Sequence, residues 1–161
     1  MRASGVIALY DRLLTACAVL VGVLILSAVL LVTADVASRY FFSAPIGWAF
    51  ELTEHILVSV AFLCMAWLVR GAGHIRIEIV LQYFSSAWQR RLNVVSHVLS
   101  GLTCAAATFY AVATTLDHYD RGIVTYGIYP IPKFILIAVI AFGLALTTIE
   151  FFRKALSVVR E

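Results

Sequence analysis

The chain has 161 residues, of which 63% are hydrophobic and only 13% are charged, and its mean hydropathy is +0.99. A soluble domain usually has about 25% charged and about 45–50% apolar residues, so this composition excludes an ordinary soluble protein and indicates a membrane protein. The net charge of +3 does not indicate nucleic-acid binding, because the basic residues are scattered along the chain.

Four windows are long and apolar enough to cross a bilayer, which takes roughly 20 residues as a helix. They cover residues 13–33, 48–69, 94–116 and 134–152. Lipid offers no hydrogen-bond partners to the backbone, so each window is predicted to be a helix rather than a strand. The sequence therefore predicts an all-α membrane protein, one four-helix transmembrane domain over residues 1–161.

Lysine and arginine are shared unequally between the loops. Nine of the twelve lie in the N-terminal segment, the middle loop and the C-terminal segment, and the other three are Arg39, Arg121 and Lys133. By the positive-inside rule, both termini and the middle loop are predicted to face the cytoplasm. The first apolar run exceeds the roughly 7–15 residues of a signal-peptide core, so we expect it to remain as an uncleaved anchor.

The first predicted helix ends in two opposite charges, Asp35 and Arg39, which are four residues apart and share one helix face. Two interpretations are open for this pair. The two side chains bind each other at the end of their own helix, or Arg39 reaches across the short outer turn to Glu51 or Glu54. Pro45 in that turn suits a position close to the start of the second helix.

The start of the second helix carries the main candidate site. Trp48 belongs either to the interfacial aromatic belt or to a contact with a partner. Glu51, Glu54 and His55 follow the spacing i, i+3, i+4 and share one helix face. This set suits a structural ion-pair network, a partner-binding surface or ion coupling. Because it lies at the outer end, where water reaches, the structural interpretation is favoured.

The segment between the second and third spans is polar on one side and apolar on the other. It begins with His74 and Arg76 and closes with Arg90 and Arg91. We predict a short amphipathic helix that lies in the cytoplasmic interface. It rests on lipid alone, or it also supports a neighbouring membrane protein.

The third span has small residues at helical spacing, which favours close helix packing in lipid. One strip contains Ser100, Cys104 and Thr108, and the neighbouring strip contains Gly101 and Ala105. His97 near the inner end of this span is expected to be hydrogen-bonded within the bundle. Glu150 in the fourth span is expected to pair with Arg153 or Lys154, which follow within about one turn.

The central parts of the four spans contain no Asp, Glu, Lys or Arg. Such residues mark transport pathways, and each costs about 2.5–3.5 kcal/mol on insertion scales. Their absence argues against a self-sufficient transporter and against a channel with a charged filter. The three cysteines lie within spans without metal-ligand spacing. We therefore expect a partner subunit with no catalysis, no metal and no cofactor.

The alternative class is a haem- or quinone-binding membrane anchor of a respiratory enzyme. Membrane bundles can hold haem between two histidines. His55 and His118 are both predicted near the outer surface, whereas His74 and His97 are near the inner one. His118 also lies beyond the expected end of the third helix, so the geometry is poor for such a site.

The chain resembles the small membrane subunit (Q-type, DctQ-like) of tripartite ATP-independent periplasmic (TRAP) transporters. The likeness rests on Arg39-Tyr40, then Pro45, Trp48 and Glu51 at the start of helix two, and His74-Ile75-Arg76 after it. Glu78 stands where that family often has aspartate, a mild departure. The four-helix layout and the interfacial segment agree along nearly the whole chain.

The resemblance implies partners that composition alone does not show. In that family a large membrane subunit (M) carries the substrate and sodium sites, and a periplasmic solute-binding protein delivers the solute, often a carboxylate or sialic acid. The small subunit extends a static scaffold in the bacterial inner membrane. Carried over to this chain, the resemblance implies that Arg39, Trp48 and Glu51 organise the outer hairpin near the large subunit, and that His74 and Arg76 hold the cytoplasmic turn. Glu54, which shares a helix face with Glu51, completes the set of expected partner-interface or structural residues.

Overall fold

The computed structural model describes residues 2–71, 86–128 and 130–160, and within them the chain forms four long helices. They are α1 (Arg2–Phe42), α2 (Gly47–Gly71), α4 (Ser86–Asp120) and α5 (Lys133–Arg160). All four are long and apolar enough to cross a membrane, which confirms the prediction of an all-α protein with four such helices. Each helix contains one of the four predicted windows and extends beyond it.

The predicted amphipathic helix falls largely on residues 72–85, which lie outside the described residues, as do His74 and Arg76. The last part of that predicted segment, from residue 86 onward, forms the first turns of α4. Arg90 and Arg91 therefore belong to a membrane-length helix.

Backbone conformation explains where these helices end. Ser43 adopts a φ of 51°, which belongs to the left-handed region, so the right-handed helix α1 stops at Phe42. Gly122 has a φ of 60° just after α4, a conformation that glycine adopts without steric cost. Pro132 precedes α5, and its missing N–H removes no bond from the first helical turn.

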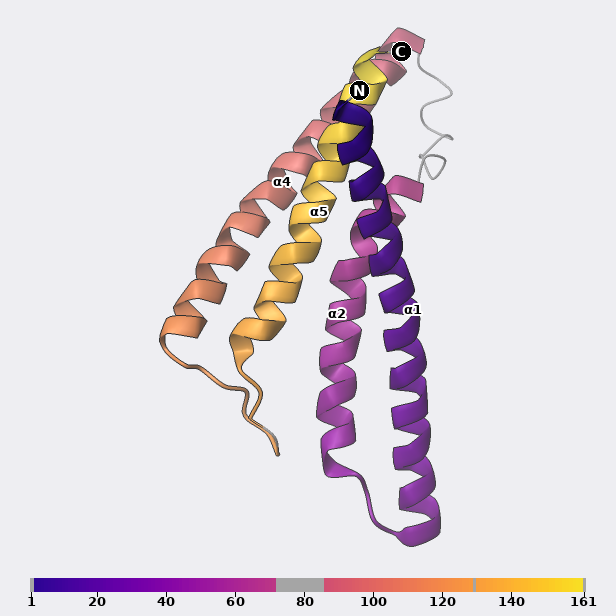
Figure 1. Cartoon of the computed structure of the whole chain (residues 1–161), viewed down its shortest axis with the longest axis vertical. Helices are drawn as coiled ribbons and strands as arrows, with labels where there is room; N and C mark the ends of the chain where they lie inside the picture. Colours follow the sequence, from indigo (N-terminus) through magenta and orange to yellow (C-terminus); the bar gives the residue numbers. More distant parts are fainter. Residues whose placement is uncertain (1, 72–85, 129, 161) are drawn as a thin grey trace.

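The four helices form two antiparallel pairs. α1 packs along α2, α4 packs along α5, and contact between α2 and α5 joins the pairs, so the order in space is α1, α2, α5, α4 (Figure 1). Both chain ends lie at one end of the bundle, here called the terminal end (Figure 1). The turn between α1 and α2 and the connection between α4 and α5 lie toward the opposite end, here called the loop end. The two pairs diverge toward the loop end.

Small residues determine how closely the two pairs approach. A buried apolar cluster joins three helices and consists of Leu14, Cys17, Ala66 and Leu146. At the crossing of α2 and α5, a β-carbon added to Gly143 would overlap the carbonyl group of Phe62. Glycine at this position therefore allows the two backbones to touch, as small residues do between membrane helices.

Small residues also line the α4–α5 contact. Gly101 and Cys104 of α4 are buried, and both belong to the strips predicted from the sequence. A β-carbon at Gly101 would meet Phe151 and Phe152 of α5 at 3.4 Å, an ordinary packing distance. The His97 ring lies with its centroid 6.2 Å from that of Phe151. These contacts make α4 and α5 one packed pair.

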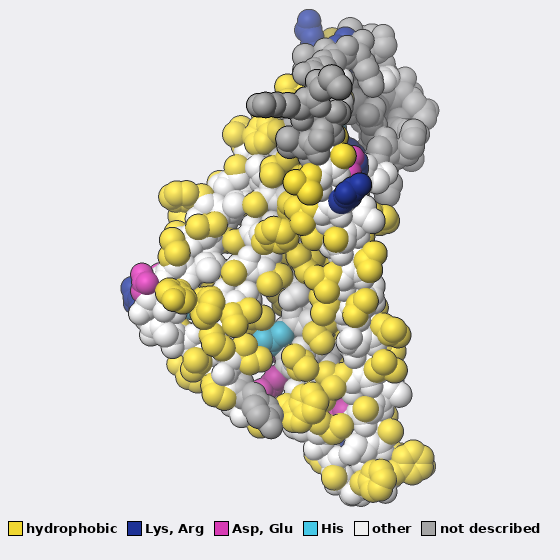
Figure 2. All heavy atoms as spheres, viewed as in Figure 1, with side chains coloured by type: hydrophobic (Ala, Val, Ile, Leu, Met, Phe, Trp, Pro, Cys, Tyr) yellow, Lys and Arg dark blue, Asp and Glu magenta, His cyan; other side chains and the backbone are white. Residues whose placement is uncertain are grey.

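The surface is largely hydrophobic (Figure 2). On α1, for example, Val19 and Leu26 are 64% and 60% exposed. A water-soluble protein would rarely leave so much contiguous apolar surface uncovered. Lipid, or another membrane protein, is the environment that this surface fits.

Candidate functional site

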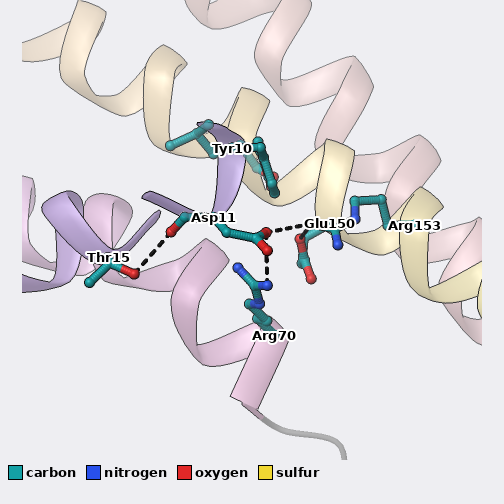
Figure 3. Close-up of polar contacts among 7 residues, drawn as sticks. Tyr10, Asp11, Thr15, Arg70, Glu150 and Arg153 are labelled. Atoms are coloured by element: carbon teal, nitrogen blue, oxygen red, sulfur yellow. Dashed lines mark hydrogen bonds and ion pairs between the residues drawn. The ribbon is translucent and has the colours of Figure 1, made fainter. Parts of the chain in front are cut away.

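Charged side chains from three helices meet at the terminal end (Figure 3). This terminal cluster consists of Tyr10 and Asp11 of α1, Arg70 of α2, and Glu150 and Arg153 of α5. Arg70 Nη2 lies 2.8 Å from Asp11 Oδ1. Arg153 Nη1 lies 3.5 Å from the same oxygen and 3.3 Å from Glu150 Oε2. Asp11 therefore links α1 to both α2 and α5.

Glu150 is a buried member of the terminal cluster, with a side chain only 5% exposed. A carboxylate removed from water needs an opposite charge and hydrogen bonds to remain stable. Arg153, three residues along the same helix, supplies them. This contact confirms the expected pairing of Glu150 with a basic residue of the next turn.

Tyr10 adds a direct bond between α1 and α5. Its hydroxyl donates to the carbonyl oxygen of Leu146 at 3.0 Å. The Arg153 guanidinium lies 5.1 Å from the centroid of the Tyr10 ring, within the range of a cation–π contact. The terminal cluster thus combines ion pairs, a side-chain-to-backbone hydrogen bond and an aromatic contact.

At the loop end, the connection between α4 and α5 folds back on itself. Val124 and Pro132 form an antiparallel bridge, and the N–H of Thr125 donates to the carbonyl of Ile131 at 2.8 Å. The N–H of Ile131 donates in return to the Thr125 hydroxyl at 2.9 Å. These bonds fix the base of the loop, and its tip reaches the start of α2.

Glu51 of α2 holds the tip of this loop. Its two carboxylate oxygens accept the N–H of Ile128 at 3.0 and 3.2 Å. A β-carbon at Gly127 would lie 2.5 Å from Glu51 Oε2, and one at Gly47 would lie 2.5 Å from Ile128 Cδ1. Two glycines therefore permit this close approach. We call Gly47, Glu51, Gly127 and Ile128 the loop-end joint, because they connect the α4–α5 pair to α2.

Asp35 holds the turn between α1 and α2. Its Oδ2 lies 2.6 Å from Arg39 Nη2, and its Oδ1 accepts the N–H of Ile46 at 2.8 Å. The Arg39 side chain is 64% exposed. Of the two interpretations drawn from the sequence, the structure shows the pair within one helix. Arg39 binds Asp35, while Glu51 binds the loop.

The other sequence-predicted residues of α2 do not converge on one point. Trp48 borders a hollow of about 400 Å³ that Glu51 and Ile131 also line. His55 Nδ1 lies 2.6 Å from the carbonyl oxygen of Glu51 on its own helix, and its Nε2 is buried without a partner among the described residues. Glu54 is exposed on another side of the helix. The predicted set is therefore divided between the loop-end joint and an open face.

The sequence did not predict that Tyr10, Asp11 and Arg70 belong to one cluster with Glu150 and Arg153. These residues lie on three helices, and no spacing rule relates them. A usable signal exists, because Asp11 is an acid at the same predicted membrane boundary as Arg70 and Arg153. Ile128 was also missed, since it takes part through its backbone N–H, which is common to almost every residue.

The geometry fits structural contacts better than chemistry on a bound group. Within the described residues, no group of three or more His, Cys, Asp or Glu side chains is placed to hold a metal ion. The ring Nδ1 of His118 lies 2.9 Å from the Thr114 carbonyl oxygen of its own helix. His55 makes the same kind of contact. The polar contacts across the bundle instead join helices at their ends.

Fold and contacts together define a small multi-pass membrane protein whose helices are joined by polar contacts near both ends of the bundle. Residues 28–161 match the family described as "Tripartite ATP-independent periplasmic transporters, DctQ component". The chain belongs to this family, which confirms the resemblance based on its motifs. It is therefore a small permease component of a transporter, and the family is not one of enzymes.

A named relative agrees with this assignment. The chain is 22% identical over 123 residues to the "Ectoine TRAP transporter small permease protein TeaB" of Halomonas elongata. The match covers 76% of this chain and 63% of that protein. The chain thus spans less than two thirds of the length of this relative.

Proposed function

We propose that this chain is the small membrane (Q) subunit of a sodium-driven TRAP transporter. In this proposal it is a static scaffold for the large transport subunit (M), which takes up an organic acid that a periplasmic solute-binding protein delivers. Solute and sodium bind to the partners, and this chain makes no contact with the solute. The family assignment supports a subunit role, and the structure supports the scaffold.

The observation that carries the scaffold proposal is the placement of polar contacts near the two ends of the bundle. The terminal cluster joins α1, α2 and α5, and the loop-end joint connects the divergent α4–α5 pair to α2. Between them lies an apolar interior in which Gly143 contacts the backbone of α2. Three separate contact regions hinder the two helix pairs from sliding or rotating past each other, as a stationary support requires.

The proposed topology places the terminal end in the cytoplasm and the loop end in the periplasm, with the chain forming one domain in the bacterial inner membrane. The excess of Lys and Arg in the terminal segments and the middle loop supports this orientation. In it, the loop-end joint faces the compartment from which the binding protein delivers the solute.

The proposed roles of the individual residues follow from their contacts. Glu51 fixes the loop tip, and Trp48 lies beside Glu51 at the periplasmic boundary of the membrane. Arg39, held by Asp35, is an exposed positive charge that partners can reach. His74 and Arg76 are proposed to hold the cytoplasmic turn against lipid or the large subunit, from the resemblance of their motif alone.

Reconstitution of the whole transporter tests the proposal. Proteoliposomes that contain this chain, the large subunit and the binding protein should accumulate the solute when an inward sodium gradient drives uptake. Vesicles with this chain alone should not. Solute uptake or a haem Soret band from the purified chain alone would contradict the scaffold proposal.

Variants of the loop end make the same test more specific. Glu51→Ala and Arg39→Ala should lower the yield of the complex or the rate of uptake, because they alter the scaffold and not a solute site. The order of preference among competing solutes should stay unchanged. A changed preference at a normal yield of complex would show that this chain contributes to solute selection.

A further inference from the structure

One face of α2 carries a carboxylate among exposed apolar side chains. This face, here called the α2 stripe, consists of Phe50, Glu54, Leu57, Ala61 and Leu68. Phe50 is 77% exposed, Leu57 and Leu68 are each 55% exposed, and Glu54 and Ala61 are exposed as well. The first four positions follow the four-and-three spacing of a heptad, and Leu68 lies one full heptad after Ala61, which keeps all five on one side of the helix.

Glu54 lies within the membrane-spanning part of α2. It lies sixteen positions before Arg70, whose side chain belongs to the terminal cluster. At the α-helical rise this separation is about 24 Å, whereas the hydrocarbon core is about 30 Å thick. With Arg70 at one boundary, the Glu54 backbone lies about 6 Å inside the other.

A carboxylate at that depth is stabilised by an opposite charge, and this chain does not supply one among its described residues. Of the six other described acids, five each bind a described group, namely Asp11, Asp35, Glu51, Asp117 and Glu150. The sixth, Asp120, is exposed at the last residue of α4. Glu54 makes no hydrogen bond or ion pair with any described residue. Charged groups within spans typically face a protein partner or water and pair with an opposite charge.

We propose that the α2 stripe is the docking surface for a transmembrane helix of the large subunit, and that this helix presents a Lys or Arg opposite Glu54. The inference rests on the proposed function, because it assumes that a large membrane subunit binds this chain. Charge complementarity selects the partner, since a neutral lipid tail has nothing to offer the carboxylate. The shape of the stripe agrees.

The apolar part of the stripe fits a helix as its occupant. Heptad-spaced side chains on two helices interlock at a shallow crossing angle of about 20°. Ala61, near the middle of the stripe, has a small side chain that would let a second backbone approach closely. Phe50 and Leu57 on either side of Glu54 would shield the ion pair from water. Arg is favoured at the partner position because its planar guanidinium binds a carboxylate through two bonds.

Charge reversal in the whole transporter tests this inference. The large subunit carries an affinity tag, and the amount of this chain recovered with it from solubilised membranes is measured. Glu54→Lys should reduce recovery by about tenfold or more, because two like charges would meet in the membrane. Asp120→Lys is the matched control, since Asp120 is also exposed and the change in charge is identical. Its recovery should equal that of the wild type.

A second substitution in the partner makes the test decisive. Membrane-embedded Lys and Arg residues of the large subunit are replaced by Glu one at a time, and each variant is combined with Glu54→Lys. One of them should restore recovery, and a photo-reactive residue at Leu57 should then crosslink this chain to the large subunit. Each variant is also purified alone, where Glu54→Lys should melt at the wild-type temperature.

The outcomes separate this inference from the proposed function. If the wild-type chain is not recovered with the large subunit, the proposed function fails. If the wild type is recovered and Glu54→Lys is recovered equally well, the docking surface is wrong while the proposed function stands. If added anionic lipid restores the recovery of Glu54→Lys, and no substitution in the large subunit does so, position 54 faces lipid and the inference is wrong.

Discussion

The two ends of this bundle are joined in different ways. At the terminal end, side chains of three helices bind one another directly, and the Asp11 carboxylate forms ion pairs with both Arg70 and Arg153. At the loop end, the pairs have diverged, and the carboxylate of Glu51 binds a backbone N–H of a loop. The first arrangement shares its energy among several contacts, whereas the second relies on one side chain.

The difference has a physical basis in how each end is packed. Where helices touch, buried charges must be paired within the protein. The charged side chains then form a network in which one group is the partner of several others. Where helices diverge, a loop has to cover the distance, and its free backbone groups are the available donors. The terminal end should therefore tolerate the loss of a peripheral contact better than the loop end does.

The contact between the two pairs should be the most sensitive point. Gly143→Ala places a β-carbon on the Phe62 carbonyl group and forces the pairs apart. We expect a loss of about 3 kcal/mol in the free energy of unfolding, measured by denaturant titration in detergent micelles. Gly22→Ala is the control, because its β-carbon would meet nothing within 4 Å. Equal stability of the two variants would contradict the assigned crossing point.

The buried acid of the terminal cluster should come next. Glu150→Ala leaves Arg153 with a weaker set of partners and opens space beside Tyr10, so we expect a loss of about 2 kcal/mol. Asp117→Ala removes an exposed pair with Arg121 and should cost less than about 0.5 kcal/mol. Thermal unfolding of the two variants under identical conditions makes the comparison. A larger effect at Asp117 would show that burial does not decide these energies.

Loss of the loop-end contact should be smaller in energy but visible locally. Glu51→Ala removes the acceptor of the Ile128 N–H, at a cost of about 1 kcal/mol. The freed loop should be cut faster by trypsin after Arg121, whose side chain is 69% exposed. Glu51→Gln keeps one acceptor oxygen and should be cut at close to the wild-type rate. An unchanged rate for Glu51→Ala would mean that this contact does not hold the loop.

The turn between α1 and α2 should show the smallest effects. Asp35→Ala frees the N–H of Ile46 as well as Arg39, whereas Arg39→Ala removes only an exposed partner of Asp35. The melting temperature should therefore fall more for Asp35→Ala than for Arg39→Ala. The reverse order would indicate that Arg39 has a further contact within this chain.

The fold was largely predictable because lipid imposes strict requirements on a chain. Any apolar stretch of about 20 residues must satisfy its own backbone, so composition and length predicted four helices. Contacts within one helix were also accessible, since Asp35 with Arg39 and Glu150 with Arg153 follow helical spacing. The small residues Gly101 and Cys104 indicated a packed face of the third span for the same reason.

Contacts between helices were not predictable from one sequence. Asp11 and Arg70 are far apart in the chain, and only the packing of α1 against α2 brings them together. Glu51 and Ile128 depend on the conformation of a loop whose binding group is a backbone N–H. The expected face of Glu51, Glu54 and His55 was divided by the structure, because the loop covers the side of Glu51 and leaves Glu54 open.

The most direct test of the scaffold is the distance between its two helix pairs at the loop end while the transporter works. Spin labels at Phe41→Cys on α1 and Leu116→Cys on α4 use exposed positions, with Cys17, Cys64 and Cys104 replaced by alanine. Pulsed dipolar spectroscopy on the complete transporter would compare samples with and without sodium, solute and binding protein. We predict one narrow distance distribution that is the same in every sample. A second peak, or a shift that follows sodium or solute, would contradict a static scaffold.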